Sequence, residues 1–299
     1  MANIVNLGSL CIDHVYQVTE IAGAGETISA TDYQVHPGGK GLNQSLAAAL
    51  AGATVAHAGA VGADAAFLLE LLQSKGVNTN QVQTLAGASG HAMIQVNAAG
   101  QNAIVINGGT NRALSRAFID NVLAQIASED WLLLQNEINE LPYILQQAAQ
   151  RKLQVALNIA PPDEQIHQLP LQAVGLLILN THEARALTEV ADFDAMLSAL
   201  ITSYPQAMIV VTCGGDGLYY RDRQATHFQQ MAAFKAEAVD ETAAGDSFIG
   251  YLLAQLCAGV ELTEALRWAS AAGALAVTKP GAASSLPARE AVSAFLHQA

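Results

Sequence analysis

The segment Ala243–Asp246 combines residue types that suit proton transfer beside an anion. Three small residues, Ala-Ala-Gly, precede Asp246, and helix-forming residues follow it. This order predicts a tight turn at the start of a helix, where unpaired backbone N–H groups and the helix dipole favour an anion. A carboxylate at that position is well placed to accept a proton from an attacking hydroxyl. An aspartate that simply caps the helix explains the same residues equally well.

The glycine turn Gly38–Gly41 is a second segment whose residues could take part in binding or catalysis. It presents Lys40, and then Asn43, at the start of another expected helix. The turn is not a Walker P-loop, because Gly41 follows the lysine where that pattern needs Ser or Thr. We expect a corner rich in hydrogen-bond donors that suits hydroxyls or a carboxylate. An ordinary turn with a solvated lysine is the alternative.

The elements that must position these turns alternate along the chain. Short apolar runs predict buried parallel strands, and longer Ala/Leu-rich segments between them carry helical spacing. This alternation predicts an α/β fold, a doubly wound and mostly parallel sheet with helices on both faces. The expected strands are Ile4–Leu7, Val55–Ala60, Trp131–Leu134, Gln154–Asn158, Leu176–Leu179 and Met208–Thr212. The expected helices are Leu42–Leu50, Ala65–Lys75, Leu141–Lys152, His182–Thr188, Phe193–Ser203 and Asp246–Ala258.

Two stretches, His14–Val35 and His91–Val105, depart from that rhythm because polar and apolar residues alternate in them. Such alternation predicts antiparallel strands with one exposed face. They would form a small sheet that stands off the main body, covers a ligand with its inner face and meets a second subunit with its outer face. Ordinary edge hairpins are the alternative.

The composition excludes several classes of partner. The chain has 299 residues, with 13 Lys and Arg against 26 Asp and Glu, which gives a net charge of −13. Proteins that bind nucleic acids or acidic membranes need clustered basic residues, so we expect neither partner. Hydrophobic residues make up 52% and charged residues 13% of the chain, as in a globular protein.

Cysteine and histidine usage points to a reduced protein without a zinc site. Cys11, Cys213 and Cys257 are far apart and lack CxxC spacing, and the eight histidines lack metal-ligand spacing. The N-terminal residues have no basic region and carry Asp13 where the apolar segment of a signal peptide should continue. We therefore expect a cytoplasmic protein.

Taken in chain order, the motifs resemble those of the ribokinase-like (PfkB) carbohydrate kinases, and of their ribokinase branch in particular. The resemblance runs nearly end to end. It implies one domain over residues 1–299, with the strands of a β-sheet lid inserted at about 12–36 and 90–108. The matching segments are Gly8–Asp13, Gly25–Thr27, Gly38–Asn43, Glu137, Asn158–Pro161, Asn180–Glu183, Thr212–Gly217 and Asp240–Asp246.

The resemblance implies a transfer of the γ-phosphoryl group of ATP to a hydroxymethyl group of a pentose-type sugar, with ribose as the leading substrate. Asp246 would be the general base, and the N–H groups of Ala243, Ala244 and Gly245 would stabilise the charge on the transferring group. The sugar would contact Cys11, Asp13, Gly39, Lys40, Gly41, Asn43, Glu137 and Asp246.

The resemblance also implies a nucleotide site and two cation sites. The nucleotide would contact Asn180, Thr212, Cys213, Gly214, Gly215, Asp216, Gly217, Gly245, Asp246 and Ser270. Glu183 would hold Mg²⁺ through water. A monovalent cation, K⁺, would be bound by Asp240, Thr242, Ala276, Lys279, Gly281 and Ser285, because carbonyl and carboxylate oxygens suit a hard cation. The resemblance further implies a homodimer formed through the lid.

Two positions depart from the family pattern. Cys11 stands where ribokinases have an Asn that binds a ribose hydroxyl, and a thiol is a weak hydrogen-bonding group. Ser270 replaces the usual His or Asn near the adenine, which leaves the base preference open. The alternatives are therefore a kinase for deoxyribose or another small carbohydrate, then a nucleoside kinase, then a sugar sensor without activity. Retention of the base, the anion site and Glu183 argues against the sensor.

Overall fold

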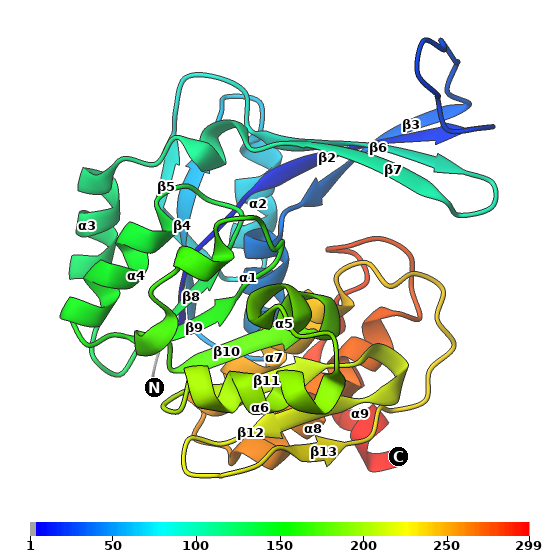
Figure 1. Cartoon of the computed structure of the whole chain (residues 1–299). Coiled ribbons are helices and arrows are strands. Elements are labelled where there is room, and N and C mark those ends of the chain that lie inside the picture. Colours follow the sequence, from blue (N-terminus) through cyan, green and yellow to red (C-terminus); the bar gives the residue numbers. More distant parts are fainter. Residues whose placement is uncertain (1–3, 299) are drawn as a thin grey trace.

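Nine strands form one continuous sheet through the centre of the computed structural model, which describes residues 4–298 (Figure 1). Their order is β13-β12-β11-β10-β9-β8-β1-β4-β5. The strands from β11 to β5 in this order run parallel, and β12 and β13 extend one edge in antiparallel fashion. The bounds are β1 Ile4–Leu7, β4 Val55–Val61, β5 Asn78–Thr84, β8 Trp131–Gln135, β9 Gln154–Asn158, β10 Leu176–Asn180, β11 Met208–Thr212, β12 Leu218–Arg221 and β13 Gln229–Met231.

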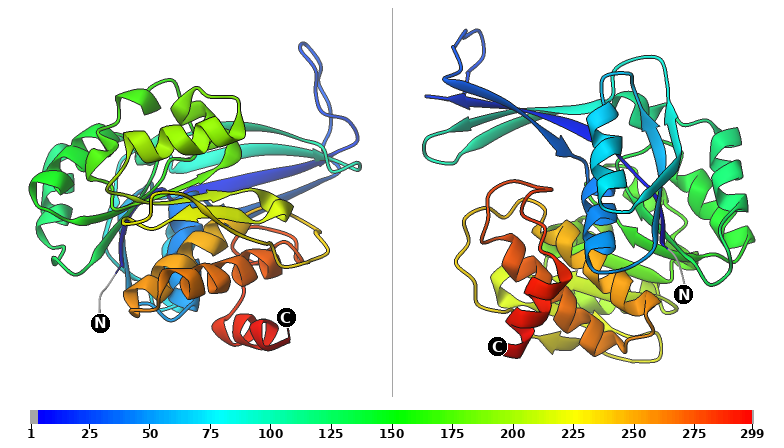
Figure 2. Two further views of the ribbon diagram at one scale, coloured as in Figure 1. Left: turned by 60° about the horizontal axis from the view of Figure 1, so that its bottom comes forward. Right: turned by 180° about the vertical axis from the view of Figure 1, so that it is seen from behind.

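Helices cover both faces of this sheet, and each face has its own apolar core (Figure 2). One face carries α1 Lys40–Leu50, α2 Ala66–Ser74, α7 Ala244–Cys257, α8 Leu262–Ala276 and α9 Arg289–Gln298. The other face carries α3 Arg116–Ala124, α4 Leu141–Gln150, α5 Thr181–Thr188 and α6 Phe193–Ser203. Four short 3-10 helices lie in loops of the described chain: η1 Gly109–Arg112, η2 Ile166–Gln168, η3 Leu171–Ala173 and η4 Gly214–Asp216. The predicted doubly wound architecture is confirmed.

A second, four-stranded sheet projects from the main body (Figures 1 and 2). Its order is β3-β2-β6-β7, with β2 Cys11–Val18, β3 Asp32–Gly38, β6 Gly90–Asn97 and β7 Asn102–Asn107. Each predicted hairpin is antiparallel, but β2 and β6 pair in parallel, so the expectation of antiparallel strands holds only within each hairpin. Alternation along a strand shows which side chains share a face, and it carries no information about the direction of the neighbouring strand.

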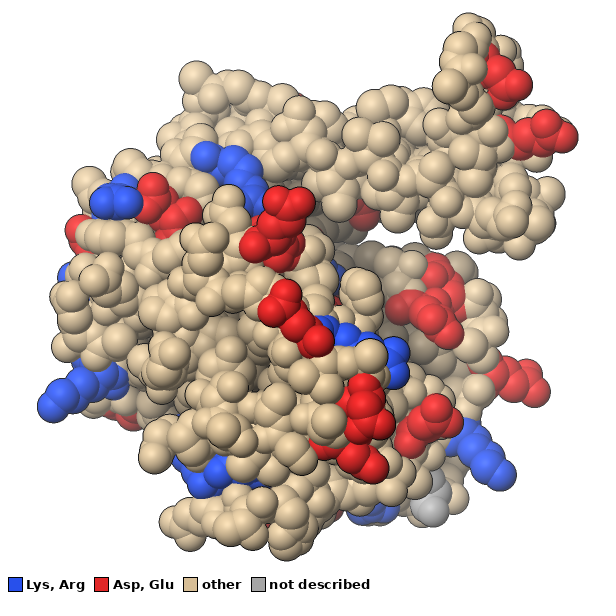
Figure 3. All heavy atoms as spheres, viewed as in Figure 1, with Lys and Arg blue, Asp and Glu red and all other residues tan. Residues whose placement is uncertain are grey.

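The register of this small sheet places distant residues in rows. Asp13 pairs with Ala92, which pairs with Ile106, whereas His14 pairs with Met93, which pairs with Val105. Because successive side chains point to opposite faces, these two rows lie on opposite sides of the sheet. The four strands contain no Lys or Arg, and in Figure 3 the projecting arm shows no basic side chains, with acidic side chains at its outer end.

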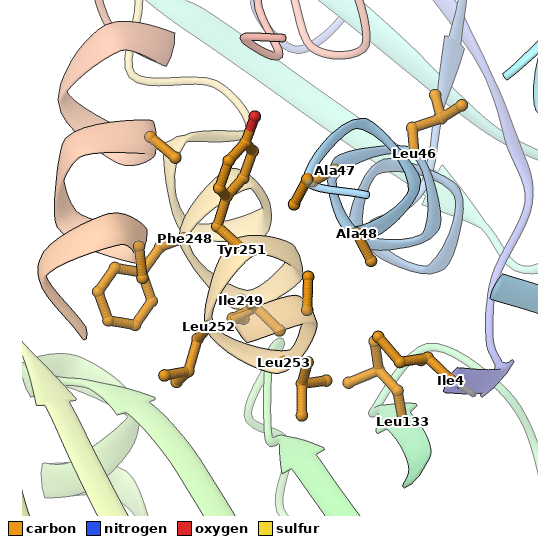
Figure 4. Close-up of a cluster of buried hydrophobic side chains, with 14 of the residues drawn as sticks. Ile4, Leu46, Ala47, Ala48, Leu133, Phe248, Ile249, Tyr251, Leu252 and Leu253 are labelled. Atoms are coloured by element: carbon orange, nitrogen blue, oxygen red, sulfur yellow. The ribbon is translucent and has the colours of Figure 1, made fainter. Parts of the chain in front are cut away.

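The helices α1 and α7 pack closely against each other (Figure 4). A Cβ atom added to Gly250 would lie 2.5 Å from Cβ of Ala47 and 2.6 Å from the backbone nitrogen of Ala48. No other residue type fits at position 250 without a shift of one helix. This contact fixes the first turn of α7, which contains Asp246, against the first turns of α1.

The apolar elements are those of a globular α/β protein. Within residues 4–298, no helix has the length and hydropathy that crossing a membrane would require.

Candidate active site

Asp246 is buried at the start of α7 and faces α1 rather than its own backbone. Only 7% of the residue is exposed. Its Oδ2 accepts a hydrogen bond of 3.0 Å from Nδ2 of Asn43, and its Oδ1 accepts one of 2.9 Å from Nε2 of Gln44. The residue that caps the helix is Ala243, with φ of 58°. The interpretation of Asp246 as a simple helix cap is therefore wrong.

The small residues before Asp246 form the predicted turn at a helix start. Gly245 faces open space, with no atom within 4 Å of the position that a Cβ would take. N–H groups in the first turn of a helix have no partner within the helix and are available to an anion. The N–H of Ala244, however, makes a 3.3 Å bond to the carbonyl of Glu241, which it would have to release in order to contact an anion.

A cavity of about 400 Å³ lies between the inner face of the small sheet and the main body. It unites four of the residues expected to bind sugar, from three separate parts of the chain. These are Cys11, Asp13, Gly39 and Glu137. The cavity is completed by Ala92, Ile106 and Gly108 from the expected lid segment, by Pro161 from the matching segment Asn158–Pro161, and by Asn111 and Arg112, which the sequence analysis did not identify. The run Gly108–Arg112, which contains two glycines after the second hairpin, is the signal that could have indicated some of them.

Two carboxylates and a lysine set the electrostatics of this cavity. Oε2 of Glu137 accepts hydrogen bonds from the N–H of Lys40, at 3.0 Å, and from the hydroxyl of Ser9. Burial, and then the negative charge of Glu137, raise the pKa of Asp13 to about 6. The negative charge of Asp246 raises the pKa of Lys40, against an opposing effect of burial. Lys40 is therefore a cation close to the carboxylates of Asp246, Glu137 and Glu183.

Cys11 is held in the cavity as a neutral thiol. Burial, followed by the charges of Glu137 and Asp13, raises the pKa of this thiol. Its Sγ lies 3.4 Å from Nδ2 of Asn111, whose other hydrogen bonds, to the N–H and the carbonyl of Leu10, fix the amide in place. Asn111 is itself 1% exposed.

Asn180 and Glu183 lie together at the start of α5, where they form a capping box. Oδ1 of Asn180 accepts from the N–H of Glu183 at 2.8 Å, and Oε2 of Glu183 accepts from the N–H of Asn180 at 3.0 Å. Burial raises the pKa of Glu183. The two residues thus have a structural role. Among the described residues, Oε1 of Glu183 accepts only from Nδ2 of Asn180, at 2.7 Å, and keeps a further lone pair for a water molecule.

The segment Thr212–Gly217 connects β11 to β12 through the short helix η4. Gly217 has φ of 93°, and a Cβ there would lie 2.1 Å from the carbonyl oxygen of Met231. The hydroxyl of Ser270, on α8, lies 3.9 Å from Sδ of the same methionine. The expected nucleotide loop and Ser270 therefore adjoin the same residue of β13, although they are more than fifty positions apart in sequence.

The expected monovalent cation residues lie at the end of α8 and on two adjacent loops. Asp240 connects them, because its Oδ2 accepts from the N–H of Gly281 at 2.8 Å and its Oδ1 accepts from the N–H of Thr242 at 2.9 Å. Burial alone would raise the pKa of Asp240, but a hydrogen bond from the Thr242 hydroxyl, at 2.6 Å, together with these two backbone bonds outweighs it and lowers the pKa. Some expected oxygens are already engaged: the carbonyl of Ala276 accepts from the N–H of Lys279, and the hydroxyl of Ser285 donates within its own turn.

A family model described as pfkB family carbohydrate kinase matches residues 1–289. The chain belongs to the pfkB family of carbohydrate kinases. The family that the motifs indicated is thereby confirmed.

Similar proteins of known name and structure agree with this membership. A ribokinase from Haemophilus influenzae is 34% identical over 302 residues, and the alignment covers 98% of each chain. A structure of Arabidopsis thaliana ribokinase complexed with ribose and ATP superposes with a TM-score of 0.88, at 28% identity and 99% coverage of both chains. A deoxyribokinase from Salmonella typhi is 29% identical over 304 residues, again with 98% of each chain covered.

In this pfkB kinase, one network of side chains connects the expected regions. Nδ2 of Asn158 lies 3.5 Å from Oε2 of Glu183, and Oδ1 of Asn158 accepts from Nε2 of Gln44 at 3.3 Å. Gln44 in turn contacts Asp246. The start of α5 and the start of α7 are therefore joined through Asn158 of β9 and Gln44 of α1, and the sequence analysis did not identify Gln44.

Proposed function

We propose that the protein is an ATP-dependent kinase that phosphorylates a hydroxymethyl group of a pentose, with ribose as the first substrate to test. The proposal depends on one observation above all: Asp246, a buried carboxylate held by two amides, lies at a helix start with open space in front of Gly245. Membership of a carbohydrate kinase family and the similarity to ribokinases, one of them complexed with ribose and ATP, support it.

In the proposed reaction, Asp246 accepts the proton of the sugar hydroxyl as that oxygen attacks. The N–H groups at Ala243–Gly245 and the ammonium of Lys40 neutralise negative charge that develops on the transferring group. Positioning and electrostatic stabilisation of this kind supply most of the catalysis in phosphoryl transfer. ATP, when bound, supplies the phosphoryl group, and we assign its contacts to Asn180, Thr212–Gly217, Gly245 and Ser270.

The sugar is proposed to bind in the cavity beneath the small sheet. The carboxylates of Asp13 and Glu137 accept hydrogen bonds from its hydroxyl groups, and backbone N–H groups at Gly39–Gly41 donate to its oxygens. Oδ1 of Asn43 is buried and has no hydrogen-bond partner within the described residues. A buried acceptor without a donor is costly, so a sugar hydroxyl at this atom would satisfy it.

Two cations are part of the proposal. Mg²⁺ would be held through water by Glu183 and would neutralise the phosphate charges of the nucleotide. K⁺ would bind at the two loops that Asp240 joins through its bonds to the N–H groups of Thr242 and Gly281. Oxygen ligands suit both hard cations.

We further propose that residues 1–299 act as one domain, with the small sheet as a lid over the sugar, and that two copies associate through its outer face. That face exposes Tyr33, Val35, Met93 and Val105, of which Val105 is 68% exposed. A cytoplasmic location is also inferred, and the free thiols of Cys11, Cys213 and Cys257 are consistent with a reducing environment.

A second candidate function, phosphorylation of a 2-deoxy sugar, is favoured by Cys11. A site that pairs a hydroxyl rejects the analogue without it, and a neutral thiol that already contacts Asn111 provides little such pairing. The similarity to a deoxyribokinase supports this candidate.

The first test is the variant Asp246→Asn. We expect turnover to fall by about 10²-fold or more, because the amide cannot accept the proton, while the affinity for ADP in calorimetric titration stays within about twofold. Near-normal turnover would show that Asp246 is not the base.

The substrate is identified with the same assay. Initial rates with ribose, 2-deoxyribose, fructose and a nucleoside, with ATP, Mg²⁺ and K⁺ present, decide between the candidates by the ratio of their kcat/KM values. Sugar binding without ADP release for any of these compounds would instead support a sensor.

A further inference from the structure

Gln44 contacts Asp246 from a position that no substrate can reach. It follows Asn43 on α1, and it is 0% exposed. Its Nε2 donates one hydrogen bond to Oδ1 of Asp246, at 2.9 Å, and one to Oδ1 of Asn158, at 3.3 Å. Both N–H bonds of the amide are therefore directed toward acceptors, and one of these acceptors is the proposed base.

The orientation of the Gln44 amide is fixed by a chain of amides beneath it. Oε1 of Gln44 accepts from Nε2 of Gln135 at 2.7 Å, and Gln135 also donates to Oδ1 of Asn6 at 3.1 Å. Nδ2 of Asn6 then donates to the backbone carbonyl of Gly41 at 2.8 Å. A carbonyl only accepts, so Asn6 must present its NH₂ group there, and this fixes the direction of each following hydrogen bond up to Gln44.

Asn158, at the other end of this series of amides, fixes the same orientation of the Gln44 amide. Nδ2 of Asn158 lies 3.3 Å from the carbonyl of Ile178, which again only accepts. Asn158 must therefore present its oxygen, and not its NH₂ group, to Gln44. With Oε1 facing one NH₂ donor and Nε2 facing two oxygens, a rotated Gln44 amide would place oxygen against oxygen and NH₂ against NH₂.

We propose that Gln44 is a positioning residue for Asp246, and that Gln135 and Asn158 hold its NH₂ group toward the carboxylate; the proposal rests on the proposed role of Asp246 as general base. The fixed donor holds Asp246 in one rotamer. Gln44 occupies one lone pair of Oδ1 and Asn43 occupies one of Oδ2, so one lone pair on each oxygen is left for the sugar hydroxyl. Hydrogen bonds to a buried charged group are stronger than those to a neutral one.

The parallel sheet explains why the amides meet at this point. Asn6 and Gln135 lie near the carboxyl ends of the adjacent strands β1 and β8, and Asn158 ends β9 on the far side of β8. The carboxyl ends of these strands meet at one edge of the sheet, where α1 begins. The charged groups that face Asp246 from other elements are Lys40 on α1 and Glu183 on α5, and neither is altered by the test below.

The test compares Gln44→Met with Gln255→Met. Methionine keeps the length of the side chain and removes the donor, and Gln255 is a glutamine of α7 that is equally buried, at 4% exposure, and outside the network. For Gln44→Met we expect kcat to fall by about 10-fold or more, with the KM values for sugar and ATP within about twofold. The acidic limb of the kcat profile should move to higher pH by about one unit, because the ionised base has lost a donor. Gln255→Met should leave kcat and the profile unchanged.

Gln135→Met provides a second variant that touches neither substrate nor Asp246. Loss of its donor frees the Gln44 amide to rotate, so we expect a smaller effect in the same direction, about threefold to tenfold on kcat. In an Asp246→Asn background, Gln44→Met should cause no further loss, since the two residues act through one group. If Gln44→Met acted only through lost packing, its reduction of kcat would multiply the reduction caused by Asp246→Asn.

The outcomes separate this inference from the proposed function. Normal kcat and an unmoved pH profile in Gln44→Met, with Asp246→Asn inactive, would overturn the role of Gln44 and leave the base in place. An equal loss in Gln44→Met and Gln255→Met would likewise overturn it. Normal turnover in Asp246→Asn would instead overturn the assignment of the base. Thermal unfolding of each variant confirms that folded protein is compared, and Gln135→Met carries the test if Gln44→Met does not fold.

Discussion

Asp13 and Glu137 face the same cavity from β2 and from the loop after β8, and their mutual repulsion is a property of the free enzyme. Ionisation of Asp13 is disfavoured by burial and by Glu137, whereas a sugar hydroxyl that donates to Asp13 would favour it. The site is therefore built for a bound donor at the expense of the stability of the empty protein. Strain of this kind at a site is typical of binding residues that are fixed by the surrounding fold.

The burial of Asp13 and its repulsion by Glu137 predict a dependence of stability on pH. The folded-state pKa of Asp13 is raised from 3.8 to about 6, so its favourable contribution is complete below pH 3.8 and is lost as the pH rises to about 6. At pH 7, Asp13→Asn should therefore have a free energy of unfolding that is larger than that of the parent protein by at most about 3 kcal/mol, and it should unfold at a higher temperature. The difference should vanish near pH 4. Thermal unfolding at both pH values checks this.

The same variant supplies its own control, because loss of the carboxylate should lower kcat/KM for the sugar by about 10-fold or more. An Asp13→Asn protein that is less stable than the parent at pH 7 would contradict the raised pKa of Asp13.

Residues near one another in the chain were predictable, and residues that meet across the fold were not. The spacing within Gly38–Asn43 and Ala243–Asp246 predicted the turns at two helix starts, and both turns exist. Asn111 and Arg112 reach the cavity only because η1 packs beneath β6 and β4, and Gln44 differs from any other buried glutamine only through its partners. Such partners depend on packing between segments more than ninety residues apart.

At the scale of elements, Gly250 determines how closely α1 and α7 approach. In an exposed helix, alanine is favoured over glycine by about 0.5–1 kcal/mol. Here the added methyl would meet Ala47 and the backbone of Ala48, at 2.5 and 2.6 Å. Separation of the two helices would also lengthen the hydrogen bonds from Asn43 and Gln44 to Asp246.

We therefore expect Gly250→Ala to destabilise the protein by about 1–3 kcal/mol and to lower kcat. Denaturant unfolding and steady-state kinetics measure the two effects. Gly273→Ala is the matched control, because a Cβ at this helical glycine of α8 would make only ordinary contacts, at 3.4 Å and beyond. Equal behaviour of the two variants would refute the role of the close contact.

Elements with a plain apolar pattern were predicted, whereas the strands at the edges of the sheet and several helices were missed. The buried strands from β8 to β11 were found within a residue or two of their bounds because they are covered on both faces. The edge strand β5, with the sequence Asn-Thr-Asn-Gln-Val-Gln-Thr, has one apolar residue and gave no signal. The helices α3, α8 and α9 were also not predicted, and neither was the antiparallel edge of β12 and β13.

For the whole molecule, the projecting sheet is the feature on which the proposed dimer depends. Its outer face exposes Val35, Met93 and Val105, which lie with His14 in one row across all four strands, and its strands carry no Lys or Arg. Contiguous apolar surface of this kind marks an interaction site. A second copy of the chain would cover it in a closed, symmetric dimer.

We expect a solution mass of about twice 31.2 kDa in light scattering at micromolar concentration. Met93→Lys, which places a charge in the centre of the row, should shift the mass to that of a single chain. Gln146→Lys, on the exposed surface of α4, should not. A single-chain mass for the parent protein would contradict association through this face.

The register of the small sheet has a consequence for how this region tolerates changes in length. Asp13, Ala92 and Ile106 line the cavity, and the row one residue further along, His14, Met93 and Val105, lies on the opposite face. Substitutions in one row leave the other row in place, so the two faces are free to diverge independently. Insertion or deletion of a single residue within β2 or β6 would exchange them, turning the cavity-lining side chains outward. Point changes are thus tolerated far more readily here than any change in strand length.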